Sequence, residues 1–545
     1  MGDLEQEESI GSHFFAIQEL LLLVLSYISP PGKERVSSID TDTLASLARV
    51  SRNISNAALD ALWRSMHQPD AIIKLLPPDA YQVTYYTAPF RPRQYSLKRP
   101  LTANDFVVFD KYAPRIHYVD FSKWSGVLGP GCELFPYIKD FRDPIFPALT
   151  DFRWEPSVQN GCIGAFHLLS RKVSLPSQEF SLLMCEHTSY QPDSSDQSDA
   201  ILRTIDAFND PALPWLPDVK KLTLRTLHFL PAVEAAVRRL FNLEYFSCDL
   251  RVGGALIEHL ANLPRLRFLD LRSLSGIATT DPDGTHFPVL ESLCVSGTLP
   301  SIAALLPLIS SPELLSVSLK AEDLTSASAA SSLSSLCSLL FPPSVPTRTA
   351  TACLTHFFFR RSSGTRSIGA DPGSNAPTRL PLVAFSPLYA CTSLQTFEVN
   401  VNPLAIGVTD ADVHAMARAW PLLTTLIIAP PRAKREGPPD VRLYALWALA
   451  TRCPRLRTLA MEVDASSEVK APFRAEEGTT SSSGHAVVMD ELMLYTSPCG
   501  DPLLVADFLN RAFPRLPSHA FHVYSTEQES QAKWVVVTEA LAYVE

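Results

Sequence analysis

The sequence lacks paired cysteines. Its ten cysteines are scattered over 545 residues, with no C-x-x-C pair and no spacing typical of a zinc site. Scattered cysteines of this kind are typical of a protein in a reducing compartment, where buried thiols act as small apolar groups. We therefore expect an intracellular protein, cytoplasmic or nuclear, that holds no metal ion.

The sequence also has no long hydrophobic run and no excess of positive charge. The apolar run at residues 20–25 follows acidic rather than basic residues, which argues against a signal peptide, and it is too short to cross a bilayer. The formal net charge is −10, which argues against a nucleic-acid backbone as the main partner. We expect neither a membrane nor a nucleic acid as a partner.

Catalytic motifs are missing as well. The sequence contains no nucleophile elbow, P-loop, H-E-x-x-H motif or dinucleotide fingerprint. Asp281-Pro-Asp283-Gly284 resembles the start of a calcium loop, but its glycine comes too early, so a turn is the simpler interpretation. We predict no catalytic residue and no cofactor, and hence a protein that is not an enzyme.

The chain does contain a recurring triplet of apolar residues, in which two residues separate the first pair and one residue separates the second. Four successive triplets begin 23, 24 and 24 residues apart. A fixed period in this range is typical of leucine-rich repeats, each of which adds a short strand to a curved parallel sheet with outer helices. The triplets are Leu243/Phe246/Cys248, Leu266/Leu269/Leu271, Leu290/Leu293/Val295 and Leu314/Val317/Leu319.

The same template extends the array in both directions, with irregular spacing. Residues 104–322 and 386–545 are predicted as leucine-rich repeats, the last closed by an apolar helix at residues 533–544. Residues 323–385 are rich in Ser, Ala and Pro, and we interpret most of them as a low-complexity surface insertion. Residues 465–486 form a second, shorter insertion. The further strands are expected to start at Leu149, Val219, Leu394, Leu423, Leu456 and Met489.

The N-terminal part has a different pattern. Residues 1–12 are polar and expected to be flexible, residues 13–67 predict three helices, and residues 68–103 read as a connector. The first helix, at residues 17–28, is apolar nearly all the way round, and about fifty residues cannot bury that much surface alone. It therefore needs cover either from the neighbouring domain or from a partner protein.

Three segments of this module carry a specific resemblance: AIQELLLLVLSYI at residues 16–28, TLASLARVSR at 43–52 and ALDALWR at 58–64. Together they resemble the F-box and F-box-like segments of fungal proteins that continue into leucine-rich repeats. The resemblance implies a three-helix module that docks onto the Skp-type adaptor of a cullin–RING ubiquitin ligase. By motif, the adaptor contacts map onto Ile17, Leu20, Leu21, Val24, Ile28, Leu44, Leu47, Val50 and Ile54.

The exposed face of the sheet is the other candidate site. Side chains alternate along a strand, so the residues between the buried ones point to the concave surface. Their mixed charges favour a protein or peptide ligand that is read by its charge pattern, although a solvated face without any ligand fits equally well. The candidates are Arg225, Tyr245, Asp249, Phe268, Asp270, Arg272, Lys320, Glu398 and Asn400.

Two functions remain open at this point. In the first, the protein is the substrate receptor of a Skp–cullin–F-box type ligase: its helices bind the adaptor, its repeats bind an unknown target protein, and proximity promotes ubiquitin transfer by another subunit. In the second, the protein is a leucine-rich-repeat scaffold that no longer binds an adaptor. Both predict an α/β fold with an F-box-like module before an irregular solenoid.

Overall fold

The computed structural model divides the chain into two compact units, Met1–Leu243 and Glu244–Glu545, which we describe separately. The structure describes residues 23–25, 38–50, 52–84, 94–120, 134–149, 151–154, 179–183, 219–225, 234–235, 237–274, 286–322, 324, 329–340, 353–361, 379–402, 404–430, 437–467, 489–514, 516–524 and 528–542.

The first unit begins with packed helices. Residues 23–25 are helical and precede α3 (Ser38–Val50) and α4 (Arg52–Arg64). Leu25, Leu44, Ile54 and Ala58 form one buried cluster, and Leu47 packs against it with part of its surface exposed. The second and third predicted helices are therefore present, the third starting three residues earlier than expected.

Short strands follow these helices. β1 (Ser65–Met66), β4 (Tyr118–Asp120), β5 (Asp151–Trp154), β6 (Glu179–Leu183) and β7 (Lys221–Arg225) pair in this order, and each neighbouring pair is parallel. Val119, Phe152, Phe180 and Leu222 occupy successive positions along one row. The sequence predicted β4, β5 and β7, whereas β1 and β6 were not expected.

The predicted connector is structured. It contains α5 (Pro69–Ile73) and an antiparallel pair of strands, β2 (Tyr81–Thr84) and β3 (Gln94–Leu97). Arg99 then binds Asp105 through two hydrogen bonds of 2.8 Å, and Asp105 also accepts a 2.7 Å bond from the backbone N–H of Thr102. This contact fixes the start of the helical turns η1 (Ala103–Phe106), α6 (Phe109–Tyr112) and η2 (Ala113–Arg115), which lead into β4; α7 (Phe135–Lys139) follows that strand.

The second unit is a stack of parallel strands, which confirms the predicted leucine-rich-repeat architecture. Ten strands pair in chain order, and every pair is parallel. They are β8 (Tyr245–Val252), β9 (Phe268–Leu274), β10 (Ser292–Gly297), β11 (Ser316–Ala321), β12 (His356–Arg361), β14 (Thr396–Asn400), β16 (Thr425–Ile428), β17 (Thr458–Ala460), β18 (Glu491–Tyr495) and β19 (Phe521–Val523).

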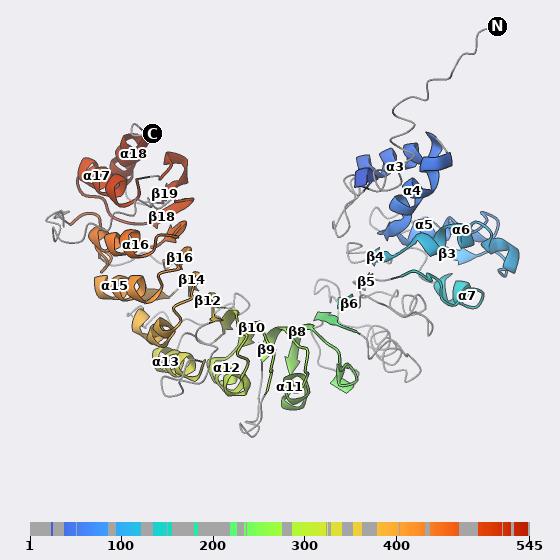
Figure 1. The fold of residues 1–545 in the computed structure, drawn as a ribbon, viewed down its shortest axis with the longest axis horizontal. Coiled ribbons are helices and arrows are strands. Elements are labelled where there is room, and N and C mark those ends of the chain that lie inside the picture. The colour runs from blue at the N-terminus through green and yellow to red at the C-terminus, as the bar shows by residue number, and fades with distance from the viewer. Residues whose placement is uncertain are drawn as a thin grey trace, which may run out of the picture. The chain divides into compact units, whose positions relative to one another are not determined.

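Helices connect these strands on the outer side of the curve that the second unit forms, and the strands line its inner side (Figure 1). One small additional sheet pairs β13 (Arg379–Pro381) with β15 (Ala405–Gly407). The helical elements are α11 (Gly254–Ala261), α12 (Leu299–Leu305), η5 (Leu306–Leu308), α13 (Ala329–Leu340), η6 (Leu382–Ala390), α15 (Asp410–Ala419), η7 (Leu443–Ala445), α16 (Leu446–Arg452), α17 (Pro502–Ala512), η8 (Ser518–Ala520) and α18 (Gln528–Ala542).

The apolar triplets hold this array together because their side chains stack in register. Leu269, Leu293, Val317, Phe357 and Phe397 are successive ladder partners, and each is almost completely buried. A parallel ladder puts equivalent residues of neighbouring repeats about 4.8 Å apart, so each row forms a continuous apolar column. The periodic spacing of the apolar triplets in the sequence therefore reflects the stacking of their side chains in this column.

Residues 323–385 require a correction, because much of this predicted insertion belongs to the repeat array. β12 pairs with β11 on one side and β14 on the other, through a triplet Leu354/Phe357/Phe359. The helix α13 buries Leu333 and Leu336. The Ser and Ala content concealed an amphipathic helix, and a spacing of 40 residues from Leu314 to Leu354 and from Leu354 to Leu394 concealed the strand.

The array ends at α18. Trp534 is 3% exposed, and its indole N–H donates a 2.8 Å hydrogen bond to the carbonyl of Ser497. The same ring lies 5.7 Å from that of Phe521 on the last strand. The predicted apolar helix at residues 533–544 thus covers the end of the sheet, starting five residues earlier than expected.

Candidate protein-binding surfaces

The two sides of the sheet in the second unit differ in chemistry. Along β11 and β18 buried residues alternate strictly with half-buried ones. The helices lie on the outer side of the sheet (Figure 1), so the buried side chains face the helices and the others form the solvent-facing side. A partner that meets this side contacts side chains only, because the strands' backbone groups are already paired with one another.

An aromatic–ionic patch occupies the solvent-facing side of β8 and β9; we define it as Tyr245, Asp249, Phe268, Asp270 and Arg272. The rings of Tyr245 and Phe268 lie 6.2 Å apart, and Phe268 is 40% exposed. The guanidinium of Arg272 lies 3.1 Å from Asp249 and 3.2 Å from Asp270. The structure therefore brings five of the nine predicted target-binding residues into one cluster.

The patch contains more negative than positive charge. Burial lowers the pKa of Arg272, but the adjacent carboxylates of Asp270 and Asp249 outweigh this effect, so the pKa is raised overall and the guanidinium stays charged. Two carboxylates surround one cation, and Asp270 also accepts a 3.0 Å hydrogen bond from the hydroxyl of Ser247. The patch thus presents exposed aromatic surface beside a fixed arrangement of charges.

Three further predicted residues lie on later strands. Glu398 accepts two 2.9 Å hydrogen bonds from Arg360 on the neighbouring strand, and Arg360 is the ladder partner of Lys320. Asn400 accepts a 2.9 Å hydrogen bond from the side chain of Asn402. Arg225 belongs to β7 in the first unit, and its side chain lies outside the described residues. Sequence reasoning missed Arg360, because it lies in the segment interpreted as an insertion.

The predicted adaptor contacts divide into core and surface residues. Leu44 has no exposed area and Ile54 is 6% exposed, so both belong to the core of the helix pair in this conformation. Their assignment as contacts with a partner stays a prediction. In contrast Val50, at the end of α3, is 69% exposed, and Leu23 is 54% exposed.

The first predicted helix is described only at its centre. Val24 is half-buried, and Leu25, which is not among the predicted contacts, is 3% exposed against α3 and α4. Four other predicted contacts lie outside the described residues: Ile17, Leu20, Leu21 and Ile28. Among the described side chains, Leu23 and Val50 are thus the apolar groups of this module that are most available to a partner.

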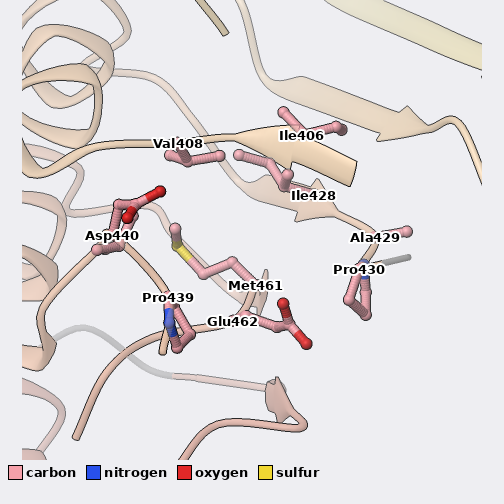
Figure 2. A pocket seen from close by; sticks show the side chains of 10 residues that line it. Ile406, Val408, Ile428, Ala429, Pro430, Pro439, Asp440, Met461 and Glu462 are labelled. Atoms are coloured by element: carbon pink, nitrogen blue, oxygen red, sulfur yellow. The ribbon is translucent and has the colours of Figure 1, made fainter. Parts of the chain in front are cut away.

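One cavity among the described residues lies beside the ends of β16 and β17, and Figure 2 shows the side chain of Met461 extending between Val408 and Pro439. Its volume is about 20 Å³. A water molecule needs about 10–15 Å³ measured in this way, so the cavity has room for a water but not for a metabolite. Its remaining lining residues are Ile406, Ile428, Ala429, Pro430, Asp440, Val441 and Glu462.

The described residues contain no group of three or more His, Cys, Asp or Glu side chains that could hold a metal ion. None of their seven cysteines is in a disulfide bond. Burial raises the pKa of Cys391 to about 12 and that of Cys453 to about 12, so these thiols stay protonated and are poor nucleophiles. On the solvent-facing side, burial and the adjacent Asp270 raise the pKa of Cys294.

Within the part of the chain that is described, no helix is both long and apolar enough to pass through a bilayer.

No protein-family model matches the chain, and no curated protein matches its sequence. Among solved structures, a protein of Bacteroides fragilis is similar over 43% of this chain, with 14% identity and a TM-score of 0.28; the match spans 65% of that protein, less than two thirds of its length. An internalin of Listeria monocytogenes is similar over 63% of this chain and 86% of its own, with 13% identity and a TM-score of 0.31. Likenesses this distant carry no argument about function. The architecture follows from the chain's own strand register and is that of a leucine-rich-repeat solenoid.

Proposed function

We propose that this protein is a non-catalytic, protein-binding subunit of a Skp–cullin–F-box type ubiquitin ligase. Its N-terminal helices dock a Skp-type adaptor and, through it, a cullin. Its repeat sheet holds a target protein, so that lysines of the target stay at high effective concentration near the ubiquitin-carrying enzyme. We also propose that the helical module is related to the F-box-like modules of fungal repeat proteins, which it resembles in sequence.

The observation that carries the target-binding half is the aromatic–ionic patch. Phe268 exposes 40% of its surface beside Tyr245. The next residue along the strand faces the core, so the large apolar ring is on the solvent-facing side of the sheet. Aromatic side chains next to Arg are enriched at protein interfaces, where they bury large areas at low entropic cost. A merely solvated sheet face gains nothing from an exposed phenylalanine.

Support for the adaptor-binding half comes from α3 and from the helical residues 23–25. Val50 and Leu23 expose more than half of their surface on a module whose core is already closed by Leu44, Ile54 and Ala58. At roughly 25 cal/mol per Å² of apolar area, covering the two exposed side chains would contribute on the order of 2–4 kcal/mol. A docking partner supplies that cover.

The scaffold alternative is favoured by one observation. Leu44 and Ile54, which the F-box resemblance assigned to the adaptor, pack inside the module instead. If that module serves only as a folded cap of the first unit, its exposed valine is incidental. The two functions then differ in a single measurable property, which is binding of the adaptor.

Light scattering on a mixture of the purified full-length chain and a recombinant Skp-type adaptor separates them. Under the proposal the mass rises by one adaptor, Val50→Asp removes the complex, and Val107→Asp keeps it, because Val107 is equally exposed (73%) but lies beside α6. Under the scaffold alternative the wild-type chain and adaptor elute separately. Circular dichroism of both variants establishes that their helices remain folded.

A further inference from the structure

A second apolar surface lies on the solvent-facing side of β16, β17 and β18. Ile427, Ala460 and Met493 are successive ladder partners and form what we call the apolar strip. Ile427 and Met493 are half-buried, and Ala460 is 3% exposed between them. With strands about 4.8 Å apart, the strip is about 10 Å long. Apolar residues on the solvent-facing side of three neighbouring strands are a feature that core packing does not explain.

Three carboxylates, which we call the carboxylate rim, surround this strip: Glu398, Glu462 and Glu491. Glu398 is the ladder partner of Ile427, and Glu491 precedes Met493 by two residues on the same side of the strand. Arg360 neutralises Glu398, but β16, β17 and β18 contain no Lys or Arg. Glu491 forms no ion pair with another described residue. The rim therefore keeps at least the uncompensated negative charge of Glu491.

All three carboxylates of the rim act on the same side chain, that of Tyr495. Burial raises the pKa of its phenol, and the charges of Glu491, Glu398 and Glu462 raise it further, so all three carboxylates lie within electrostatic range of one hydroxyl. Tyr495 also adopts a left-handed backbone conformation, with φ of 45°. That conformation costs on the order of 1–2 kcal/mol for a residue other than glycine and is found preferentially at functional sites.

We propose that the apolar strip and the carboxylate rim dock a basic amphipathic helix of a partner protein. This inference rests on the target-binding half of the proposed function. The occupant is a helix because the backbone of these strands is already hydrogen-bonded in the ladder, so a segment that satisfies its own backbone groups fits best. It is basic because the rim carries negative charge without cations on the three central strands.

The dimensions agree with this occupant. Apolar residues at positions i, i+4 and i+7 of a helix span about 10.5 Å, the length of the strip. Glu462 and Glu491 are each two residues along the chain from a member of the strip, so they lie about 6.6 Å to either side of the strip. Lys side chains that flank the apolar stripe of a helix can reach that far. The aromatic–ionic patch, in contrast, holds its own Arg272 between its carboxylates.

Fluorescence anisotropy of labelled peptides with the full-length protein tests the inference. The probe is an 18-residue designed helix with Leu at i, i+4, i+7 and i+11 and Lys at the flanking positions. One control peptide replaces every Lys by Glu, and another scrambles the same composition so that no apolar stripe forms. We expect the probe to bind at 50 mM salt at least about tenfold more tightly than either control, and more weakly as salt rises.

Variants locate the site. Glu491→Lys should weaken binding of the probe by about tenfold, because it turns an attractive contact into a repulsive one, and Met493→Ser by about five- to tenfold through lost apolar contact. Val383→Ser, at an exposed position (59%) of η6 outside both proposed surfaces, is the matched control and should leave the dissociation constant unchanged. Thermal melting of each variant checks that the repeats remain folded.

The inference is overturned if the Glu peptide or the scrambled peptide binds as tightly as the probe. It is also overturned if neither Glu491→Lys nor Met493→Ser changes the affinity, or if Val383→Ser changes it equally. These results are separate from adaptor binding: a chain that binds the probe at the strip but no adaptor keeps this inference and loses the ligase assignment, and the reverse result does the opposite.

Discussion

The prediction that bears most on the repeat architecture concerns Phe397, at the centre of the aromatic part of the core. Its side chain has no exposed area. Its ring lies 5.9 Å from Phe357, 5.7 Å from Phe385 and 4.9 Å from Trp420, contacts that join two strands to the two helices behind them. Phe397→Ala removes all of these contacts at once and leaves a cavity between neighbouring repeats.

The expected loss of unfolding free energy is about 3–5 kcal/mol, the usual cost of deleting a buried phenylalanine side chain. Phe397→Leu keeps most of the apolar volume and loses mainly the three ring contacts, so it should cost less than Phe397→Ala after repacking. Thr396→Ala, at the adjacent solvent-facing position, should change the stability by less than about 0.5 kcal/mol.

Hydrogen exchange followed by mass spectrometry on the full-length chain measures where this destabilisation appears. Each repeat packs only on its neighbours, so exchange should accelerate in β12, β14, β16 and the helices between them, and much less in α17 and α18. Equal acceleration throughout the chain would show a single globular core in place of a stack of repeats. An effect of Thr396→Ala as large as that of Phe397→Ala would contradict the assignment of the two sides of the sheet.

Two further predictions concern the C-terminal helix and an ion pair of the first unit. Trp534→Ala should destabilise α18 by about 3–5 kcal/mol and expose the C-terminal end to limited proteolysis, whereas Val535→Ala, at a position 51% exposed, should not. The hydrogen bonds of Arg99 hold the pKa of Asp105 well below its ordinary value. The stability that this carboxylate contributes is therefore full above its unfolded pKa near 4 and is lost as the pH falls through the folded pKa. Asp105→Asn removes this contribution, whereas Asp79→Asn, at a position 68% exposed, keeps it. Urea unfolding between pH 3 and 7 should therefore show that the free energy of unfolding depends less on acid for Asp105→Asn than for Asp79→Asn.

The periodic part of the fold was predictable because the core rows repeat every 23 or 24 residues from Leu243 to Leu314. The prediction failed where that rhythm changed. β12 uses Phe357 and Phe359 instead of leucine and follows a helix of mostly Ser, Ala and Leu, so composition suggested an insertion. Sequence spacing identifies a repeat only when its neighbours have the same length.

The candidate surfaces were predictable to a different extent. Strand alternation alone put Tyr245, Phe268 and Arg272 on one side, and the structure adds that Arg272 lies between two carboxylates. In the helical module, an apolar stripe does not reveal which of its members face the core. Leu25 and Leu44 turned inward and Val50 outward, and that choice depends on how three helices pack together.

The central claim is that the N-terminal helices dock an adaptor while the repeats stay available for a target. The most direct measurement is hydrogen exchange of the full-length chain with and without a saturating Skp-type adaptor. The account predicts slower exchange at residues 23–25 and in α3, with no change from β8 to β19. Unchanged exchange throughout, or protection confined to the repeat strands, would contradict it.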